Sequence, residues 1–134
     1  MRFLIGIFVF VLVAGCGSSP VSSDRADPVP TQRLFAFSDK AEAQLIVTRD
    51  GGLYGSGCNY RFYIDGTLAA EFAAGEVARF GLPAGRHILG STFSGACGGG
   101  SVVEREIDIR PGETMKRRIS VLIGGVQDIS PTAF

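Results

Sequence analysis

From residue 33 onward the chain alternates between apolar and polar residues, which is the pattern of β-strands with one buried face. In residues 60–64 the side chains of Tyr60, Phe62 and Ile64 fall on one side, with more polar residues between them. The same alternation predicts strands over residues 43–49, 67–72, 77–82, 86–93, 102–109 and 115–123. Short strands at this spacing, separated by glycine or proline, are typical of a small antiparallel β-sandwich or a barrel-like relative of it.

The segments between these strands carry turn residues. Asp65-Gly66 predicts a two-residue hairpin, and "PAG" at 83–85 and "RPGET" at 110–114 are further turns. The one candidate helical turn is "SDKAEA" at 38–43, with Ser38 as its cap. We therefore predict an all-β domain over residues 33–134.

The first 32 residues follow a different pattern. After Arg2, residues 3–14 form an unbroken apolar run, which is typical of a signal peptide and shorter than the roughly 20 residues of a membrane-spanning helix. An uncleaved membrane anchor is the less favoured alternative. Residues 17–32 contain several prolines and few apolar side chains, so we predict a flexible tether there.

The residues at 13–16, "VAGC", resemble the lipobox of bacterial lipoproteins. The resemblance implies cleavage before Cys16, attachment of a diacylglycerol to its thiol and a further acyl chain, such as palmitate, on its amino group. Two or three acyl chains anchor a protein stably, whereas one is marginal. Gly17, where an aspartate would favour the inner membrane, implies the periplasmic face of the outer membrane. The expected organisation is a signal peptide over 1–15, the lipidated cysteine and flexible linker over 16–32, and the sandwich over 33–134.

The globular part resembles the PEGA-type β-sandwich and a related group of small uncharacterised bacterial lipoproteins. The resemblance covers residues 60–121 and is carried by Asp65-Gly66, by "LPAGRH" at 82–87 and by "PGET" at 111–114. It implies an extracytoplasmic adhesive or accessory module rather than a catalyst. The segment "STFSGACGGGS" at 91–101 and both of the later cysteines depart from the plain pattern of this group.

Charge and cysteine content narrow the class of protein. The chain has 13 basic and 13 acidic residues, and its one basic cluster, residues 116–118, is split between two strand faces, so a nucleic-acid partner is not expected. With Cys16 lipidated, Cys58 and Cys97 are an even pair in an oxidising compartment, and we predict that they form a disulfide. The bridge is either a structural staple alone or a staple that also presents a recognition surface. A single histidine argues against a zinc site, and no metal or cofactor is expected.

The disulfide would join two glycine-rich loops, which are the candidate partner-binding region. Tyr54 and Tyr60 flank the first loop and would serve as binding anchors when exposed, and Ala96 lies in the second loop. Neither loop contains a G-x-G-x-x-G order that would indicate phosphate binding. His87 is the one candidate general base, and we interpret it as structural.

The predicted function is that of a lipid-anchored, non-enzymatic envelope lipoprotein that binds or supports an unidentified envelope protein. The alternative is a periplasmic inhibitor or immunity protein directed against a hydrolase, such as a lysozyme, or against a secreted antibacterial toxin. Small size, a lipid anchor and protruding loops suit both functions. The chain lacks the loop motif of the membrane-bound lysozyme-inhibitor family, so inhibition ranks second. An enzyme is the least favoured interpretation.

Overall fold

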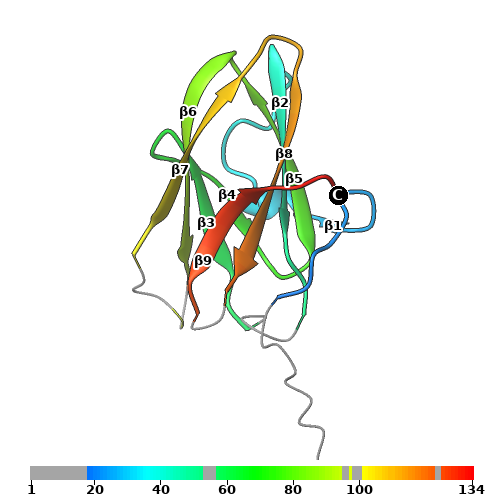
Figure 1. Ribbon diagram of the computed structural model, residues 1–134, viewed down its shortest axis with the longest axis vertical. Helices are drawn as coiled ribbons and strands as arrows, with labels where there is room; N and C mark the ends of the chain where they lie inside the picture. The colour runs from blue at the N-terminus through cyan, green and yellow to red at the C-terminus, as the bar shows by residue number, and fades with distance from the viewer. Residues whose placement is uncertain (1–17, 53–56, 95–96, 98–100, 123–124) are drawn as a thin grey trace, which may run out of the picture.

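Two β-sheets pack face to face (Figure 1) in the computed structural model, which describes residues 18–52, 57–94, 97, 101–122 and 125–134. The five-stranded sheet has the order β1 (Asp27–Pro28), β5 (Glu76–Leu82), β2 (Ala43–Arg49), β8 (Thr114–Val121) and β9 (Gln127–Pro131). The four-stranded sheet has the order β4 (Thr67–Phe72), β3 (Tyr60–Ile64), β6 (Gly85–Phe93) and β7 (Val103–Ile109). The predicted all-β sandwich is confirmed, and the two sheets do not close into a barrel.

The core lies between the sheets and is built from the alternating apolar residues. Phe62 of β3 stacks on Phe80 of β5 with ring centroids 5.6 Å apart, and it meets Phe72 edge to face at 5.9 Å. The stacked pair joins the two sheets, because β3 and β5 belong to different sheets. Other fully buried core side chains include Leu45, Val47, Ile64, Leu82, Leu89 and Ile119.

The predicted turns occur where the sequence places them. Asp65 and Gly66 both have positive φ angles, 50° and 77°, as a tight turn between twisted strands requires, and they connect β3 to β4. The turn after Leu82 takes the chain from the five-stranded to the four-stranded sheet, and the turn around Gly112 brings it back from β7 to β8. The described chain therefore crosses repeatedly between the sheets.

The five-stranded sheet is mixed rather than antiparallel. β2 and β8 run parallel, from the pair Gln44 and Thr114 to the pair Arg49 and Ile119, and β1 runs parallel to β5. The antiparallel prediction is wrong for these two pairs. Alternation shows which face of a strand is buried, but it carries no information about the direction of the neighbouring strand.

The structure also corrects the flexible linker predicted for residues 16–32. From residue 18 onward this segment packs on the sandwich, since Ser19 and Gly51 exchange backbone hydrogen bonds of 2.9 and 2.8 Å and Val29, 5% exposed, joins the core. β1 covers the outer edge of β5, where Pro28 is tolerated because an edge strand leaves one side unpaired. The amino-acid composition did not predict this packing, because the segment is held largely by backbone hydrogen bonds, which any residue type can make.

Two further expectations differ from the structure. Residues 38–43 form no helical turn, whereas residues 31–33, just before them, form the 3-10 turn η1 (Thr31–Arg33). β9 was not predicted at all, and it pairs antiparallel with β8. Its only large apolar residue is Ile129, which is buried, so β9 shows no alternation by which it could be recognised.

Candidate functional site

One end of the sandwich gathers the disulfide and the surrounding connections. Cys58 and Cys97 are bonded, with their Cα atoms 5.9 Å apart and a sequence separation of 39, which confirms the predicted pair. The bridge links the β2–β3 connection to the β6–β7 connection. We call this region the disulfide end and define it by residues 50–52, 57–59, 73–75, 97, 101–102, 122 and 125–126. It is the lower end in Figure 1.

Of the four residues predicted for lipidation or partner binding, the structure describes Tyr60 alone. Cys16, Tyr54 and Ala96 lie outside the described residues. Tyr60 is fully buried, and its ring meets Phe93 edge to face at 4.9 Å. Tyr60 is therefore not a surface anchor, because it occupies the first inward position of β3.

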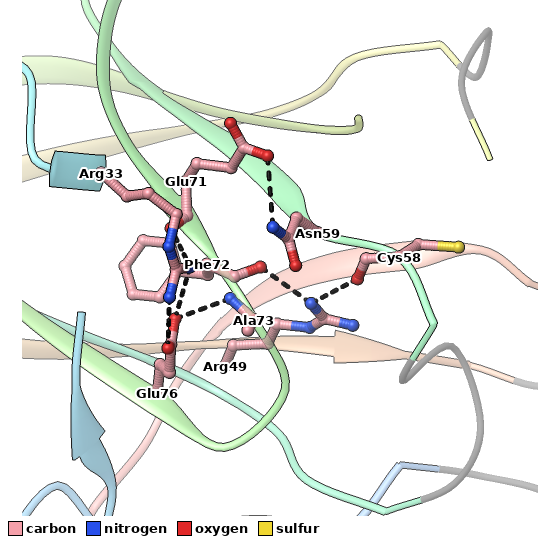
Figure 2. Close-up of polar contacts among 8 residues, drawn as sticks. All are labelled: Arg33, Arg49, Cys58, Asn59, Glu71, Phe72, Ala73 and Glu76. Carbon is pink, nitrogen blue, oxygen red and sulfur yellow. Dashed lines mark hydrogen bonds and ion pairs between the residues drawn. The ribbon is translucent and has the colours of Figure 1, made fainter. Parts of the chain in front are cut away.

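Arg49 is the polar centre of the disulfide end, and the sequence analysis did not single it out. It continues the inward alternation of β2, and it is only 2% exposed. Its guanidinium lies 3.9 Å from the centre of the Tyr60 ring, and its Nη1 donates to the carbonyl oxygens of Cys58 at 2.6 Å and Phe72 at 2.8 Å. Figure 2 shows the guanidinium between these two carbonyls. Arg49 thereby joins β2, the entry to β3 and the end of β4.

Burial and nearby groups act in opposite directions on Arg49. Burial lowers the pKa of Arg49, while Tyr60 and Glu76 act to raise it, and the net shift is downward. An arginine side chain nevertheless stays charged in proteins. A cation over an aromatic face with charge-assisted hydrogen bonds to carbonyls is a stabilising arrangement, so the chemistry of Arg49 is that of a structural tie.

A second arginine fixes the turn between β4 and β5. Arg33 of η1 makes two parallel hydrogen bonds to Glu76, of 2.8 and 2.6 Å, and donates to the carbonyl of Glu71 at 2.8 Å (Figure 2). The hydrogen bond to Glu76 raises the pKa of Arg33 against a smaller opposing effect of burial. The backbone N–H of Ala73 also donates to Glu76, at 2.7 Å. Both carboxylate oxygens of Glu76 are therefore used to hold backbone and side chain in place.

Glu71 receives hydrogen bonds from the two connections that the disulfide joins. Its Oε1 accepts from Asn59 Nδ2 at 3.3 Å and from Ser94 Oγ at 2.9 Å. The Ser94 backbone N–H donates to the Asn59 carbonyl at 2.9 Å. The polar groups next to the disulfide thus bind each other and hold the two connections together.

The beginning of the described chain is attached to the same end. Ser18 Oγ donates to Asp50 at 2.7 Å and accepts from the backbone N–H of Val121 at 3.0 Å. Asp50 also accepts from Arg118 Nη2 at 2.7 Å and Nε at 3.1 Å. We call the contacts of Ser18 and Ser19 with Asp50, Gly51 and Val121 the N-terminal clasp.

His87 lies at the opposite end, beside the β3–β4 turn. Its Nδ1 is 2.6 Å from Asp65 Oδ2 and its Nε2 is 2.7 Å from the Pro83 carbonyl oxygen. Both partners are acceptors, so both ring nitrogens donate when the imidazole is protonated. Burial lowers the pKa of His87, but the hydrogen bonds to Asp65 and Pro83 and the charge of Asp65 outweigh it, and the pKa is raised.

The serines near His87 in sequence are not brought to it. Ser91 Oγ donates to Gln127 at 2.6 Å in the interior, and Ser94 Oγ donates to Glu71. Each of these groups has its own partner, so the structure does not assemble a nucleophile and base from them.

Two features are absent from the described residues. Within the described ranges no group of three or more His, Cys, Asp or Glu side chains could hold a metal ion. The same part of the chain contains no helix long and apolar enough to cross a membrane. Comparisons with protein-family models, with curated proteins and with solved structures found no match, so the lipoprotein and PEGA-type resemblances remain predictions.

Proposed function

We propose that this chain is a lipid-anchored, non-enzymatic lipoprotein of the bacterial envelope. It is held through Cys16 at the periplasmic face of the outer membrane, where its sandwich acts as an accessory or binding module for an envelope protein. The observation that carries the proposal is the pairing of the cysteines. The chain has three, and the bond between Cys58 and Cys97 leaves Cys16, at the end of the apolar run, as the one available for lipid.

The disulfide also supports the proposed compartment. Structural disulfides form and persist in oxidising environments such as the bacterial periplasm and are rare in the cytosol. A short sandwich with an internal bridge is the kind of domain that an extracytoplasmic protein uses. The bond between Cys58 and Cys97 is therefore consistent with export of the chain.

The non-enzymatic part of the proposal is supported by how the polar side chains are used. Arg49, Glu71 and Glu76 hold backbone segments of the disulfide end together. His87 holds Asp65 and the Pro83 carbonyl. These groups, which could otherwise serve as acids, bases or electrophiles, are already committed to stabilising the fold.

The proposal is tested by following lipid on the full chain. We expect a diderm bacterium fed a clickable palmitate analogue to label the wild-type protein, and the label to appear in the outer-membrane fraction. Cys16→Ser should abolish the label, because it removes the thiol that accepts the lipid. The matched control is the double variant Cys58→Ala/Cys97→Ala, which should keep it. An unlabelled wild type, or a labelled Cys16→Ser variant, would overturn the proposal.

A further inference from the structure

The N-terminal clasp determines which end of the sandwich is next to the proposed anchor. Cys16 lies two positions before Ser18, and two residues of fully extended chain span about 7 Å. Ser18 is held to Asp50 and Val121, and Ser19 to Gly51, all at the disulfide end. A lipid on Cys16 therefore holds this end close to the headgroups, instead of letting the domain move on a long tether.

The two ends of the sandwich differ in charge. Among the described residues of the disulfide end, residues 51–52, 57–58, 97, 101–102, 122 and 125–126 include no Asp, Glu, Lys or Arg. The charged groups just behind them, Arg49, Asp50 and Glu76, are buried and engaged. Exposed charges begin beside this end in the segment after the clasp, at Asp24, Arg25 and Asp27, and the Asp27 N–H donates to the Gly75 carbonyl at 3.0 Å. The connections at the opposite end carry Asp39, Lys40, Glu42, Asp65, Arg110 and Glu113. An uncharged surface can enter the bilayer interface without the cost of removing ions from water.

The described part of the disulfide end also exposes apolar side chains. Leu122 is 51% exposed and Val126 is 56% exposed. They lie beside each other at the base of the β8–β9 turn, where the Leu122 N–H donates to the Val126 carbonyl at 2.7 Å. Val102, next to the start of β7, is exposed too, but it lines a groove with Ile88 and Glu104 and is therefore not counted with this pair. Exposed apolar side chains without nearby charge are the groups that insert into the boundary between headgroups and acyl chains.

We propose that the disulfide end is a lipid-contacting surface that seats the sandwich directly on a phospholipid bilayer, with the charged end pointing away from it. This inference rests on the proposed lipidation of Cys16. It commits to the bilayer as the occupant because the clasp ends two residues from the anchor. Since the described connections of this end carry no exposed charge, we expect the contact not to depend on anionic lipid. The charged end and the sheet faces remain available to a protein partner.

Tryptophan fluorescence tests the proposal, because the chain contains no tryptophan. Single residues are introduced as Val126→Trp and, as the matched control, Ile88→Trp. Ile88 is 38% exposed and lies toward the opposite end, where its carbonyl accepts from the Asp65 N–H. The lipidated mature protein is placed in phosphatidylcholine vesicles that contain brominated phosphatidylcholine, a quencher confined to the bilayer.

We expect the Val126→Trp emission to shift to the blue and to be quenched at least twofold more than that of Ile88→Trp. Exchanging part of the phosphatidylcholine for phosphatidylglycerol should leave the result unchanged. Leu122→Trp serves as a second reporter if the first variant does not fold. Equal quenching at both positions would overturn the seating while leaving the anchor intact, provided that the protein floats with the vesicles.

The other outcomes separate the two proposals. Failure to float, with no acyl mass on Cys16, would overturn the anchor and the seating together. A blue shift at Val126→Trp in the unlipidated Cys16→Ser protein without vesicles, growing with protein concentration, would show that a second protein copy covers the disulfide end, and it would overturn the lipid assignment.

Discussion

At the scale of single residues, the adjacent charged side chains of Arg49 and Asp50 bind different parts of the chain. Arg49 points between the sheets and holds two backbone carbonyls, whereas Asp50 binds Arg118 and Ser18. His87 performs a similar task at the other end with Asp65. Each of these side chains holds together segments that are distant in sequence, so each should be measurable as stability.

Replacing Arg49 should destabilise the domain strongly. Arg49→Met keeps much of the apolar volume but leaves the carbonyls of Cys58 and Phe72 without their donor, and we expect a loss of about 2–4 kcal/mol in the free energy of unfolding. The matched control is Arg61→Met on the exposed face of β3, which should change stability by no more than about 0.5 kcal/mol. Urea unfolding of both variants gives the comparison, and equal stabilities would contradict the role of Arg49.

The pair of His87 and Asp65 predicts a dependence of stability on pH. The pKa of His87 is raised above 6.5, so its contribution is full below that pH and is lost as pH rises through the folded value. Burial raises the pKa of Asp65, but its hydrogen bonds to His87 and Ile88 outweigh this effect and lower it below 3.8, so that contribution is lost in acid. The pair should therefore stabilise the fold most between about pH 4 and 6.5.

This expectation is checked by comparing the wild type with His87→Gln. The difference in free energy of unfolding should be larger at pH 5.5 than at pH 9, because only the protonated imidazole donates from both nitrogens. In the background of Asp65→Asn the dependence should be much weaker. A difference that is the same at both pH values would refute a charged pair.

At the scale of elements, the sequence reveals strands better than it reveals their neighbours. The alternation at 60–64 and the Asp65-Gly66 turn were sufficient to predict β3, its buried face and its hairpin with β4. β1 and β9 have too few apolar residues to show a period, and the parallel direction of β8 depends on crossings between sheets. Within the site, the number of cysteines was enough to predict the disulfide. The contacts of Arg49 could not be predicted, because they depend on folding that brings the carbonyls of Cys58 and Phe72 close to its guanidinium.

Gly81 of β5 lies against the backbone of residues 39–41, so a larger residue at this position should destabilise the fold. A Cβ atom at Gly81 would overlap the carbonyl oxygen of Asp39 and lie 2.7 Å from the backbone N of Ala41. We expect Gly81→Ala to cost at least about 2 kcal/mol, because backbone atoms must move to make room. Gly57→Ala is the matched control, since a Cβ there would meet nothing within 4 Å. Thermal unfolding of the two variants distinguishes them, and an unchanged midpoint for Gly81→Ala would refute the close approach.

At the scale of the whole molecule, the two ends of the sandwich have different chemistry. The described connections of the disulfide end carry no exposed charge, and this end is held by a covalent bond, by the contacts of Arg33 and Arg49 and by the N-terminal clasp. The opposite end carries charged connections and the pair of His87 and Asp65. If Cys16 carries the proposed lipid, this difference between the ends gives the domain one preferred orientation relative to the membrane.

The disulfide should contribute substantially to the stability of the whole domain. Closing a loop of 39 residues restricts the unfolded chain, and the chain-entropy model gives about 4 kcal/mol for this length. Cys58→Ala/Cys97→Ala should lose most of that amount in urea unfolding under oxidising conditions. Reductant should destabilise the wild type and leave the double variant unaffected. Equal stability of the oxidised wild type and the double variant would argue against the staple role.

The parallel pairing of β2 with β8 also sets an order of events during synthesis. Ser18 is held by Val121, the last residue of β8, and β2 gains its parallel neighbour only once residues 114–121 are available. Contacts between segments so distant in sequence form slowly. Under the proposed lipidation, the chain is exported with its N-terminus first, and the contact of Ser18 with Val121 can form only once nearly all of the chain has crossed the membrane. Under that proposal we expect the lipid to be attached before the domain folds.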